Sequence, residues 1–456
     1  MSKNTANSTT GADGDETANA TPSHANPLVT VDELRTYYES EKLLGGKPVK
    51  AVDGVSFEIG RGETFGIVGE SGCGKTTLGR SILRLEDIED GTVTFDGTDV
   101  TSLGRRELKE WRRDAQMVYQ NPTSSINDRM TVGEIIREPL EVHNWKTASQ
   151  RRDRVWELLD RVGLRSEHYH RYPHQFSGGQ RQRVGIARAL ALEPEFIVLD
   201  EPVSALDVSV QAKILNLLSE LQEEFGLTYM LIAHDLSVVR HICDRVGVMY
   251  LGTLMEVGPT EQLFESPSNP YTRSLLSAIP QPDPSVGADR ITLRGTPPNP
   301  RDPPTGCVFS TRCPFKIRQP EHEQLTDDQW AGIEEFRRVI RERDQARTTV
   351  VQRAKGQLGL GSRFTPIREV TNELFGSLSY PDAIKETLDR ATELVAGGNV
   401  TEARDLLDEE FSTVCEHDTP CQQGVTDEQS SRCHRHSQEY QEPGEYLSDS
   451  GEYLPE

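Results

Sequence analysis

One short stretch, residues 63–85, constrains the fold of this chain more than any other. It reads ETFGIVGESGCGKTTLGRSILRL: an apolar strand from Phe65 to Val68, the pattern G-x-x-x-x-G-K-[ST] from Gly69 to Thr76, and then a helical segment. A glycine-rich turn between a strand and a helix points successive backbone N–H groups and the helix N-terminus at a phosphate. The stretch therefore predicts an α/β domain of the P-loop class that binds a nucleotide.

The chemistry expected of this loop follows from its side chains. Lys75 supplies a mobile positive charge for the β- and γ-phosphates, and the Thr76 hydroxyl is a ligand for Mg²⁺. A glycine-rich turn formed by chance is the alternative, but the strand, the helix and the Lys-Thr pair disfavour it. The residues predicted to surround the phosphates are Gly69, Glu70, Ser71, Gly72, Cys73, Gly74, Lys75, Thr76 and Thr77.

Two later segments narrow the class of nucleotide-binding protein. The segment FSGGQ, Phe176 to Gln180, leads into the helical pattern RQRVGIARALAL and offers a second anion-binding helix start. One chain does not need two phosphate cradles for one nucleotide. Farther on, the apolar run FIVL delivers Asp200 and Glu201 at the end of a buried strand. The first carboxylate suits Mg²⁺ and the second suits a water molecule.

Charge and hydropathy exclude two classes of partner or location. The chain has 456 residues and a net charge of −23, which makes nucleic acid an unfavourable bulk partner. No uninterrupted apolar stretch approaches the ~20 residues that a bilayer crossing needs. Only 11 of the 50 basic residues are lysine, beside 73 acidic residues. This pattern favours a protein from an organism that lives in high salt, such as a halophilic archaeon. The alternative is an ordinary acidic protein.

The composition also changes along the chain and predicts its organisation. Polar residues dominate both ends, prolines crowd the segment after the α/β domain, and helical patterns follow. We expect a disordered tail (1–27), an α/β domain (28–258), a Pro-rich linker with one short helix (259–306), a C-terminal extension (307–436) with helical patterns in 316–414, and a polar tail (437–456).

Together these motifs resemble the nucleotide-binding subunit of an ABC transporter. FSGGQ, IVLDEP, SALD and a later histidine follow the P-loop in the family's order, and the resemblance covers Leu28 to about Cys313. It implies ATP and Mg²⁺ as cofactors and a helical subdomain at about 121–190 within the α/β domain. The roles that it implies are base stacking for Tyr38 (or Tyr37), the Q-loop for Gln120, the signature for Ser177, Gly178, Gly179 and Gln180, Mg²⁺ binding for Thr76, Gln120 and Asp200, the general base for Glu201, the D-loop for Ser204 to Asp207, and the switch histidine for His234.

Longer stretches are similar to one subfamily, the ATPases of oligopeptide/dipeptide importers, and to their F-type subunit. These stretches include QNPTSSINDRMTVGEIIREPL, SPSNPYTRSLLSAIP and TGCVFSTRCPF. The resemblance implies a paired homologous ATPase subunit, two permease subunits and an external solute-binding protein. It also implies a peripheral position on the cytoplasmic face of the membrane. Relatives carry peptides, nickel or sugars, so the sequence does not identify the transported solute. Within the C-terminal extension, residues 316–414 depart from the family pattern as a helical insertion.

Two other ATPase classes share the motifs but fit less well. DNA-repair and chromosome ATPases insert a long coiled coil between P-loop and signature, whereas 101 residues separate Lys75 from Ser177 here. Soluble ABC proteins that act on the ribosome carry two cassettes in one chain, and one is found here. A protein without catalysis would be expected to have lost Lys75 or Glu201, and both are present.

Five of the seven cysteines follow the linker, and four of these five are considered as two pairs. Cys307 and Cys313 enclose five residues, and Cys415 and Cys433 enclose seventeen. Importer ATPases resemble this with four C-terminal cysteines, although their third follows the second closely. Four thiolates suit a [4Fe–4S] cluster, towards which the resemblance points, or Zn²⁺; unligated thiols are the alternative. Cys421 is a possible substitute for Cys415, and Cys73 and Cys243 are interpreted as structural.

Overall fold

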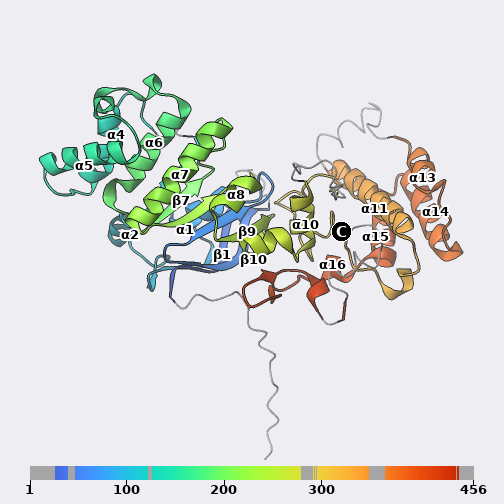
Figure 1. The fold of residues 1–456 in the computed structure, drawn as a ribbon. Coiled ribbons are helices and arrows are strands. Elements are labelled where there is room, and N and C mark those ends of the chain that lie inside the picture. Colours follow the sequence, from blue (N-terminus) through green and yellow to red (C-terminus); the bar gives the residue numbers. More distant parts are fainter. Residues whose placement is uncertain are drawn as a thin grey trace, which may run out of the picture.

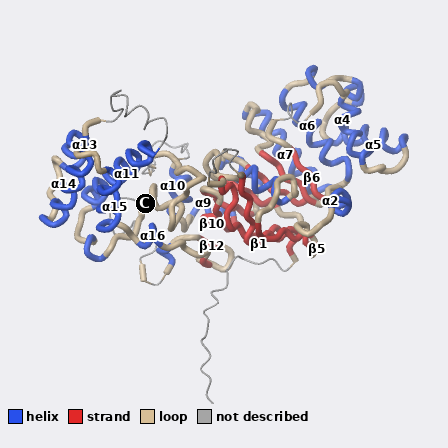
Figure 2. The backbone as a smooth tube through the Cα atoms, turned by 180° about the vertical axis from the view of Figure 1, so that it is seen from behind, coloured by secondary structure: helices blue, strands red, loops and turns tan. Residues whose placement is uncertain are grey.

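The computed structural model describes residues 26–39, 47–121, 126–278, 291, 293, 295–348, 365–437 and 439–440, without the side chains of 345–348. The predicted disordered tail (1–27) and polar tail (437–456) lie largely outside these residues and stay predictions. The described part has three regions in a row: a helical subdomain at one end, two β-sheets in the middle and a helical insertion at the other end (Figure 1; Figure 2).

The larger sheet has the order β11-β12-β10-β9-β3-β8-β7-β6. The pairs β9–β3, β3–β8, β8–β7 and β7–β6 are parallel, and the rest are antiparallel. Every residue of β3, β7 and β8 is buried, as expected of parallel strands covered on both faces. The bounds are β3 (Thr64–Val68), β6 (Ala115–Val118), β7 (Phe196–Asp200), β8 (Thr228–Ile232), β9 (Arg245–Tyr250), β10 (Thr253–Pro259), β11 (Gln423–Gly424) and β12 (Ser430–Ser431).

The smaller sheet is antiparallel, with the order β2-β1-β4-β5. Its strands are β1 (Pro27–Tyr38), β2 (Val49–Gly60), β4 (Asp90–Phe95) and β5 (Thr98–Asp99). Helix α1 (Lys75–Ile82) packs against strands of both sheets, and its Leu78 and Ile82 belong to the hydrophobic core that the sheets share. The helix that follows the P-loop is therefore held on both sides.

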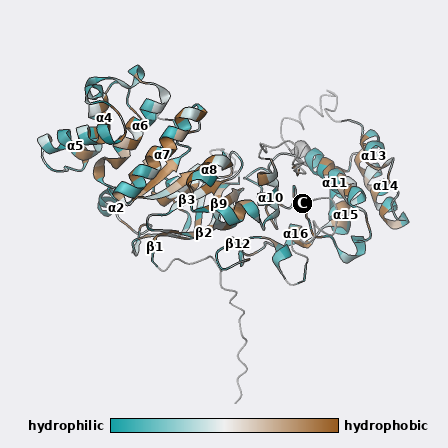
Figure 3. Ribbon diagram, viewed as in Figure 1, coloured by the Kyte–Doolittle hydropathy of each residue, from teal (hydrophilic) through white to brown (hydrophobic). Residues whose placement is uncertain are grey.

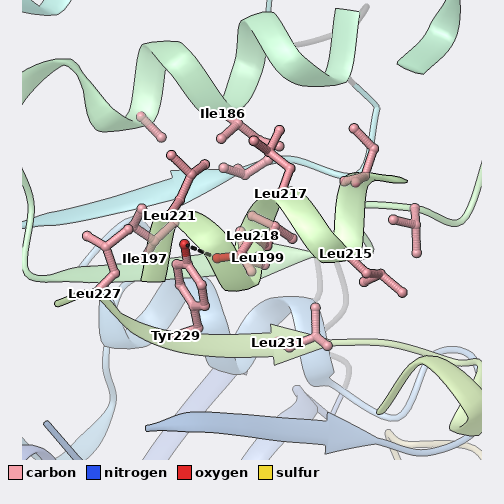
Figure 4. Packing of buried hydrophobic residues seen from close by; sticks show 14 of the residues in the cluster. Ile186, Ile197, Leu199, Leu215, Leu217, Leu218, Leu221, Leu227, Tyr229 and Leu231 are labelled. Carbon is pink, nitrogen blue, oxygen red and sulfur yellow. Dashed lines mark hydrogen bonds between the residues drawn. The ribbon is translucent and has the colours of Figure 1, made fainter. Parts of the chain in front are cut away.

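A second hydrophobic core joins the helical subdomain to the larger sheet. Leu217, Leu218 and Leu221 of one helix pack beside Ile197 and Leu199 of β7, as Figure 4 shows. The helices around this core are α4 (Val132–Val142), α5 (Ala148–Arg161), α6 (Gly178–Ala189), α7 (Val208–Phe225) and α8 (Leu236–Ile242), with short 3₁₀ turns η1 (Ser166–His170), η2 (Pro173–Gln175) and η3 (Leu190–Leu192). Helix α2 (Arg105–Trp111) packs instead on the first core through Trp111.

The helical insertion has a hydrophobic core of its own. Trp330, Ile333, Phe336, Leu407 and Phe411 are buried in it, and Figure 3 shows hydrophobic and hydrophilic faces on the same helices. The elements after β10 are α9 (Thr260–Glu265), α10 (Pro270–Ser277), η4 (Pro320–His322), α11 (Asp327–Thr348), α13 (Ile367–Phe375), α14 (Asp382–Ala396), α15 (Val400–Phe411), α16 (Val414–His417) and η5 (His434–His436).

The chain returns from the insertion to the larger sheet. Strand β12 pairs with β10, with Ser431 opposite Glu256, and β11 pairs with β12. The segments on either side of the insertion therefore lie against the same α/β domain. The expectation of one short helix in the linker was incomplete, because both α9 and α10 form there. Within the described residues, no helix combines the length and the apolar character that crossing a membrane requires.

Candidate functional site

The P-loop connects β3 to α1, and its glycines are required by close backbone contacts. Gly69 has φ +151°, and a Cβ there would lie 2.1 Å from the Met249 carbonyl oxygen. Gly74 has φ +107°, and a Cβ there would lie 1.9 Å from the Ala51 carbonyl oxygen. These approaches exclude any larger residue. The loop is thus shaped by its contacts with neighbouring strands as well as by its conformational freedom.

Lys75 begins α1 and folds back over the loop that precedes it. Its Nζ donates to the carbonyl oxygens of Gly69 (2.8 Å) and Glu70 (3.0 Å), and the residue is 6% exposed. The ammonium group therefore lies among backbone oxygens, where it is able to turn towards a phosphate.

The neighbouring Thr76 connects the P-loop to the end of β7. Its Oγ1 donates to Oδ1 of Asp200 at 2.9 Å. Asp200 is buried, and burial is the main cause that raises the pKa of its carboxyl group. A hydroxyl and a carboxylate in contact are suitable oxygen ligands for Mg²⁺. Two of the three residues that the sequence predicts for Mg²⁺, Thr76 and Asp200, are thus brought together, whereas the third, Gln120, contacts Glu201.

Glu201 is the centre of a second set of contacts. Its Oε2 accepts a hydrogen bond from Nε2 of Gln120 (2.7 Å) and lies 3.1 Å from Nδ1 of His234. The backbone of Glu201 has φ +46°, which is unusual for a non-glycine residue, and its N–H donates to the Ile232 carbonyl. The sheet therefore holds this carboxylate in a strained conformation between two polar side chains from other loops.

Lys75, Thr76, Gln120, Glu201 and His234 line one pocket of about 510 Å³. Tyr38 lies at its wall, and its hydroxyl is 3.3 Å from Oγ1 of Thr77. The alternative, Tyr37, donates instead to Asp53, and its pKa is raised mainly by burial and then by that hydrogen bond. The lining residues are Tyr38, Val49, Lys50, Ala51, Ser71, Gly72, Cys73, Gly74, Lys75, Thr76, Thr77, Gln120, Glu201, His234, Leu251, Gly252 and Pro300.

Several lining residues were not predicted from the sequence. Ala51 and Gly252 come from chain segments without a motif, and Pro300 comes from the linker. Gly252 has φ +81°, and its N–H donates to the Cys73 carbonyl, so it supports the P-loop from behind. The glycine in the turn YLGT was the only available signal, and it is too weak to indicate a site.

The signature and D-loop residues lie apart from this pocket. Ser177 begins α6, where its Oγ accepts from the Gln180 N–H (3.3 Å) while its own N–H donates to Oε1 of Gln180 (3.0 Å). Asp207 begins α7, and Ser204 donates to the Glu201 carbonyl oxygen. Among the described residues that line the pocket, none comes from Ser177–Gln180 or Ser204–Asp207.

The four predicted cysteine ligands gather in the C-terminal extension. Each of the six pairs among Cys307, Cys313, Cys415 and Cys433 interacts electrostatically. Burial, more than any neighbour, raises the pKa of all four thiols, to about 12 for Cys307 and about 11 for Cys433. The Cys307 N–H also donates to the Cys415 carbonyl (2.8 Å). The two pairs thus meet across the insertion.

Their arrangement is nevertheless not that of a formed metal centre. In the described part of the chain, no three side chains of His, Cys, Asp or Glu are grouped as they would be around an ion. Cys421 is exposed, and its Sγ accepts from Nε2 of Gln423, so it is outside the group. Cys73 and Cys243 are buried in the α/β domain, and Cys73 also lines the nucleotide pocket, so their structural roles stay predictions.

Comparison with known proteins gives a family to each region. A family model described as "ABC transporter" matches residues 52–204, and one described as "Oligopeptide/dipeptide transporter, C-terminal region" matches 255–319. A third, "Domain of unknown function (DUF8228)", matches 327–428. Most of the helical insertion therefore matches a family model that is described without a function.

The chain is similar to curated ATP-binding proteins over most of the length of those proteins. It is 55% identical over 291 residues to the putative oligopeptide transport ATP-binding protein YkfD of Bacillus subtilis, covering 63% of this chain and 88% of that one. It is 58% identical to the oligopeptide transport ATP-binding protein OppF of the same organism, covering 55% and 82%. The solved structure of cbiO1 from Clostridium perfringens is 29% identical, with a TM-score of 0.47, over 53% and 92%. The sequence matches to curated relatives establish that this chain belongs to the ATP-binding subunits of the oligopeptide/dipeptide ABC transporter family.

Proposed function

We propose that this chain is the ATP-hydrolysing subunit of an importer for peptides or a related solute. The observation that carries the proposal is the position of Glu201, in contact with Gln120 and His234 at the pocket that the P-loop lines. A carboxylate so placed polarises a water molecule for attack on the γ-phosphate. Lys75 binds the phosphates, and Thr76 and Asp200 hold Mg²⁺ when it is bound. Tyr38 stacks on the base.

The proposal includes a homologous ATPase partner. Ser177–Gln180 belongs to this chain but is not part of its pocket, so it is available to a nucleotide held by a neighbour. In return, the partner's signature would complete the pocket described here. The D-loop, Ser204–Asp207, comes shortly after Glu201 in the chain and lies beside the shared site in this arrangement. Closure on ATP and opening after hydrolysis then form the working cycle.

The permease partners would receive this movement near Gln120. A groove of about 170 Å³ lies between β6 and α6, and Tyr119, the neighbour of Gln120, is on its wall. Leu85, at the rim, is 41% exposed. We place a cytoplasmic segment of a permease in this groove, with the chain peripheral to the cytoplasmic face of the membrane. A cysteine substituted for Leu85 should cross-link to a permease subunit.

The test of the function is transport by the assembled complex. The chain should be purified with its membrane partners, placed in proteoliposomes with the external binding protein, and supplied with peptides, nickel or sugars. Peptide uptake that requires ATP and disappears in Lys75→Ala supports the proposal. Uptake of nickel or a sugar instead would reassign the solute. ATP hydrolysis with no membrane partner at all would favour a non-transport ABC ATPase.

We also propose that Cys307, Cys313, Cys415 and Cys433 hold a [4Fe–4S] cluster, with Zn²⁺ as the alternative metal. The support is the hydrogen bond from the Cys307 N–H to the Cys415 carbonyl (2.8 Å), which brings the two pairs together across the insertion. Such a centre would brace the two ends of the extension against each other. The measured quantities are iron, sulfide and zinc content, with visible absorption near about 400 nm, after anaerobic purification. Cys433→Ser should lose the metal and Cys421→Ser should keep it.

The net charge of −23 and the preference for arginine support a halophilic source. Because self-repulsion grows as screening weakens, lowering KCl from about 2 M to about 0.1 M should lower the melting temperature. An unchanged melting temperature over this range would contradict this part of the proposal.

A further inference from the structure

The C-terminal extension touches the P-loop through one ion pair. Arg312, next to Cys313, points both ends of its guanidinium at Glu70: Nη1 lies 2.8 Å from Oε2 and Nη2 lies 3.1 Å from Oε1. The Arg312 side chain is 7% exposed and that of Glu70 is 25% exposed. A bidentate contact at this burial is much stronger than a surface ion pair, because water screens it little.

Glu70 is also connected to the residues that line the nucleotide pocket. Its N–H donates to the Tyr271 hydroxyl (3.1 Å), and its carbonyl oxygen accepts from Nζ of Lys75 (3.0 Å). All three polar parts of Glu70 are therefore held, two by the segments after β10 and one by the phosphate-binding lysine. A continuous chain of contacts runs from the extension to Lys75.

The support for Arg312 is rigid. Tyr250, Tyr271 and Phe309 form an aromatic group with ring centroids 4.7 to 5.3 Å apart. Nη1 of Arg312 is also 3.3 Å from the Tyr250 hydroxyl, and its guanidinium lies 5.9 Å from the ring centroid of Tyr250. Strand β9, helix α10 and the segment between Cys307 and Cys313 thus fix Arg312 in one place, so it presents its charge to the P-loop without rearranging.

We propose that Arg312 is a positioning residue for ATP binding, which holds the P-loop and neutralises the carboxylate of Glu70. The inference rests on the proposed assignment of Gly69–Thr77 as the phosphate-binding loop. A carboxylate within that loop repels a triphosphate unless a cation compensates it. The extension supplies the cation, and nucleotide affinity thereby depends on a region outside the ATP-binding domain.

This role predicts how ATP affinity changes in single and double variants, and a residue that only stabilised the fold would not give the same pattern. Arg312→Gln leaves Glu70 uncompensated and should weaken ATP binding about tenfold, the effect of losing a charged hydrogen bond. Glu70→Gln removes the repulsive charge and should change affinity less than about threefold. In the double variant the charge is absent again, so its affinity should return to that of Glu70→Gln. Adding Glu70→Gln should therefore restore the ATP affinity that Arg312→Gln loses.

The measurement is the Kd of a fluorescent ATP analogue for the full-length chain, with KM and kcat of the assembled complex. Arg312→Gln should raise Kd and KM and leave kcat within about twofold, because the hydrolytic contacts of Glu201 are intact. Arg312→Lys keeps a positive charge and should stay within about threefold of wild type. An unchanged Kd in Arg312→Gln, or a double variant as weak as Arg312→Gln, overturns the proposal.

Two controls separate this outcome from others. Arg318 is also in the extension, with a side chain 14% exposed, and it donates to the Leu325 carbonyl. Arg318→Gln should leave Kd unchanged, and an equal loss there would overturn the role of Arg312. Lys75→Ala tests the underlying assignment: if it binds ATP as wild type does, the proposed nucleotide site fails. If Lys75→Ala loses binding while Arg312→Gln does not, only this inference fails.

Discussion

The α/β domain and the helical insertion use buried charge in opposite ways. In the domain, Asp200 ends β7 in contact with Thr76 of the nucleotide pocket, and Glu201, the next residue, lines that pocket, so both charges lie next to the ligand site. In the insertion, Arg337 is 1% exposed in its side chain and is surrounded by Glu334 (2.7 Å), Asp408 (2.8 Å) and Glu416 (2.9 Å). The carboxylates of the domain are therefore positioned for a ligand, whereas the charged groups of the insertion are paired with one another and stabilise its fold.

Lys316 and Arg341 complete the second arrangement, which we name the charge cluster: Lys316, Glu334, Arg337, Arg341, Asp408 and Glu416. Glu416 directly follows Cys415, and the cluster therefore ties the helices of the insertion to the cysteine segment. Buried charge alone thus does not indicate catalysis; a neighbouring pocket with an unshielded carboxylate does.

The largest effect should come from the domain. Glu201→Gln removes the general base and should lower kcat by about 10²- to 10⁴-fold, because the amide does not accept a proton. ATP binding should remain, since Lys75, Thr76 and Asp200 are unchanged. Lys75→Ala is the matched control and should lose binding itself. Turnover at the wild-type rate by Glu201→Gln in the assembled complex would remove Glu201 from its role.

The next effect should come from the charge cluster. Arg337→Met leaves three carboxylates without their shared cation and should destabilise the insertion by about 3–5 kcal/mol. Arg338→Met is the control, because the Arg338 side chain is 31% exposed and pairs with Glu335 and Glu342 on its own helix. Loss of these surface ion pairs should destabilise the insertion by about 1 kcal/mol or less. Hydrogen exchange should accelerate in 327–411 and not in 64–82. Equal acceleration in both would show that the regions unfold together.

Acid should affect the insertion in a defined direction. Burial on its own raises the pKa of Glu334, but Lys316 and Arg337 outweigh it and hold that pKa below its ordinary value of 4.5. A carboxyl group whose folded pKa is lowered contributes stability above its unfolded pKa and loses it as pH falls through the folded value. The free energy of unfolding of the insertion should therefore decrease as the pH falls below 4.5. Urea unfolding of Glu334→Gln should show a weaker dependence on pH, and an equal dependence in the variant would show that other carboxyl groups cause the loss.

The same contrast explains what could be predicted from the sequence. The P-loop, Asp200 and Glu201 follow from motifs, because phosphate and Mg²⁺ chemistry fixes residue types at fixed spacings. The helical subdomain was expected from the family resemblance instead. Helices in 316–414 could be predicted from periodicity, but the partners of Arg337 could not, since Glu334, Asp408 and Glu416 are joined only by tertiary packing.

The pairing of Arg312 with Glu70 was missed for the same physical reason. The two residues are 242 positions apart, and neither has a local pattern that indicates the other. The meeting of the four cysteines depended on whether the ends of the insertion lie together, which the spacing left open. The return of β12 to β10 brings those ends to the same domain.

The smallest effect tests whether the two regions follow the same local rules while unfolding separately. Thr131 begins α4 in the helical subdomain, where its Oγ1 accepts from the Glu134 N–H (3.4 Å) and its N–H donates to Oε2 of Glu134 (2.7 Å). Thr326 precedes α11 in the insertion and exchanges the same pair of bonds with Gln329 (3.3 and 2.8 Å). Each Thr→Ala variant leaves a helix N–H without its acceptor and should cost about 1 kcal/mol.

The measurement is again hydrogen exchange, read separately over 132–142 and 327–344. Thr131→Ala should accelerate exchange only in the first segment and Thr326→Ala only in the second, because the hydrophobic cores beneath them share no residue. If instead each variant accelerates both, the extension and the ATP-binding domain form one cooperative unit. The contact between Arg312 and Glu70 would then be one of several that couple them, and its loss should have the same effect on both segments.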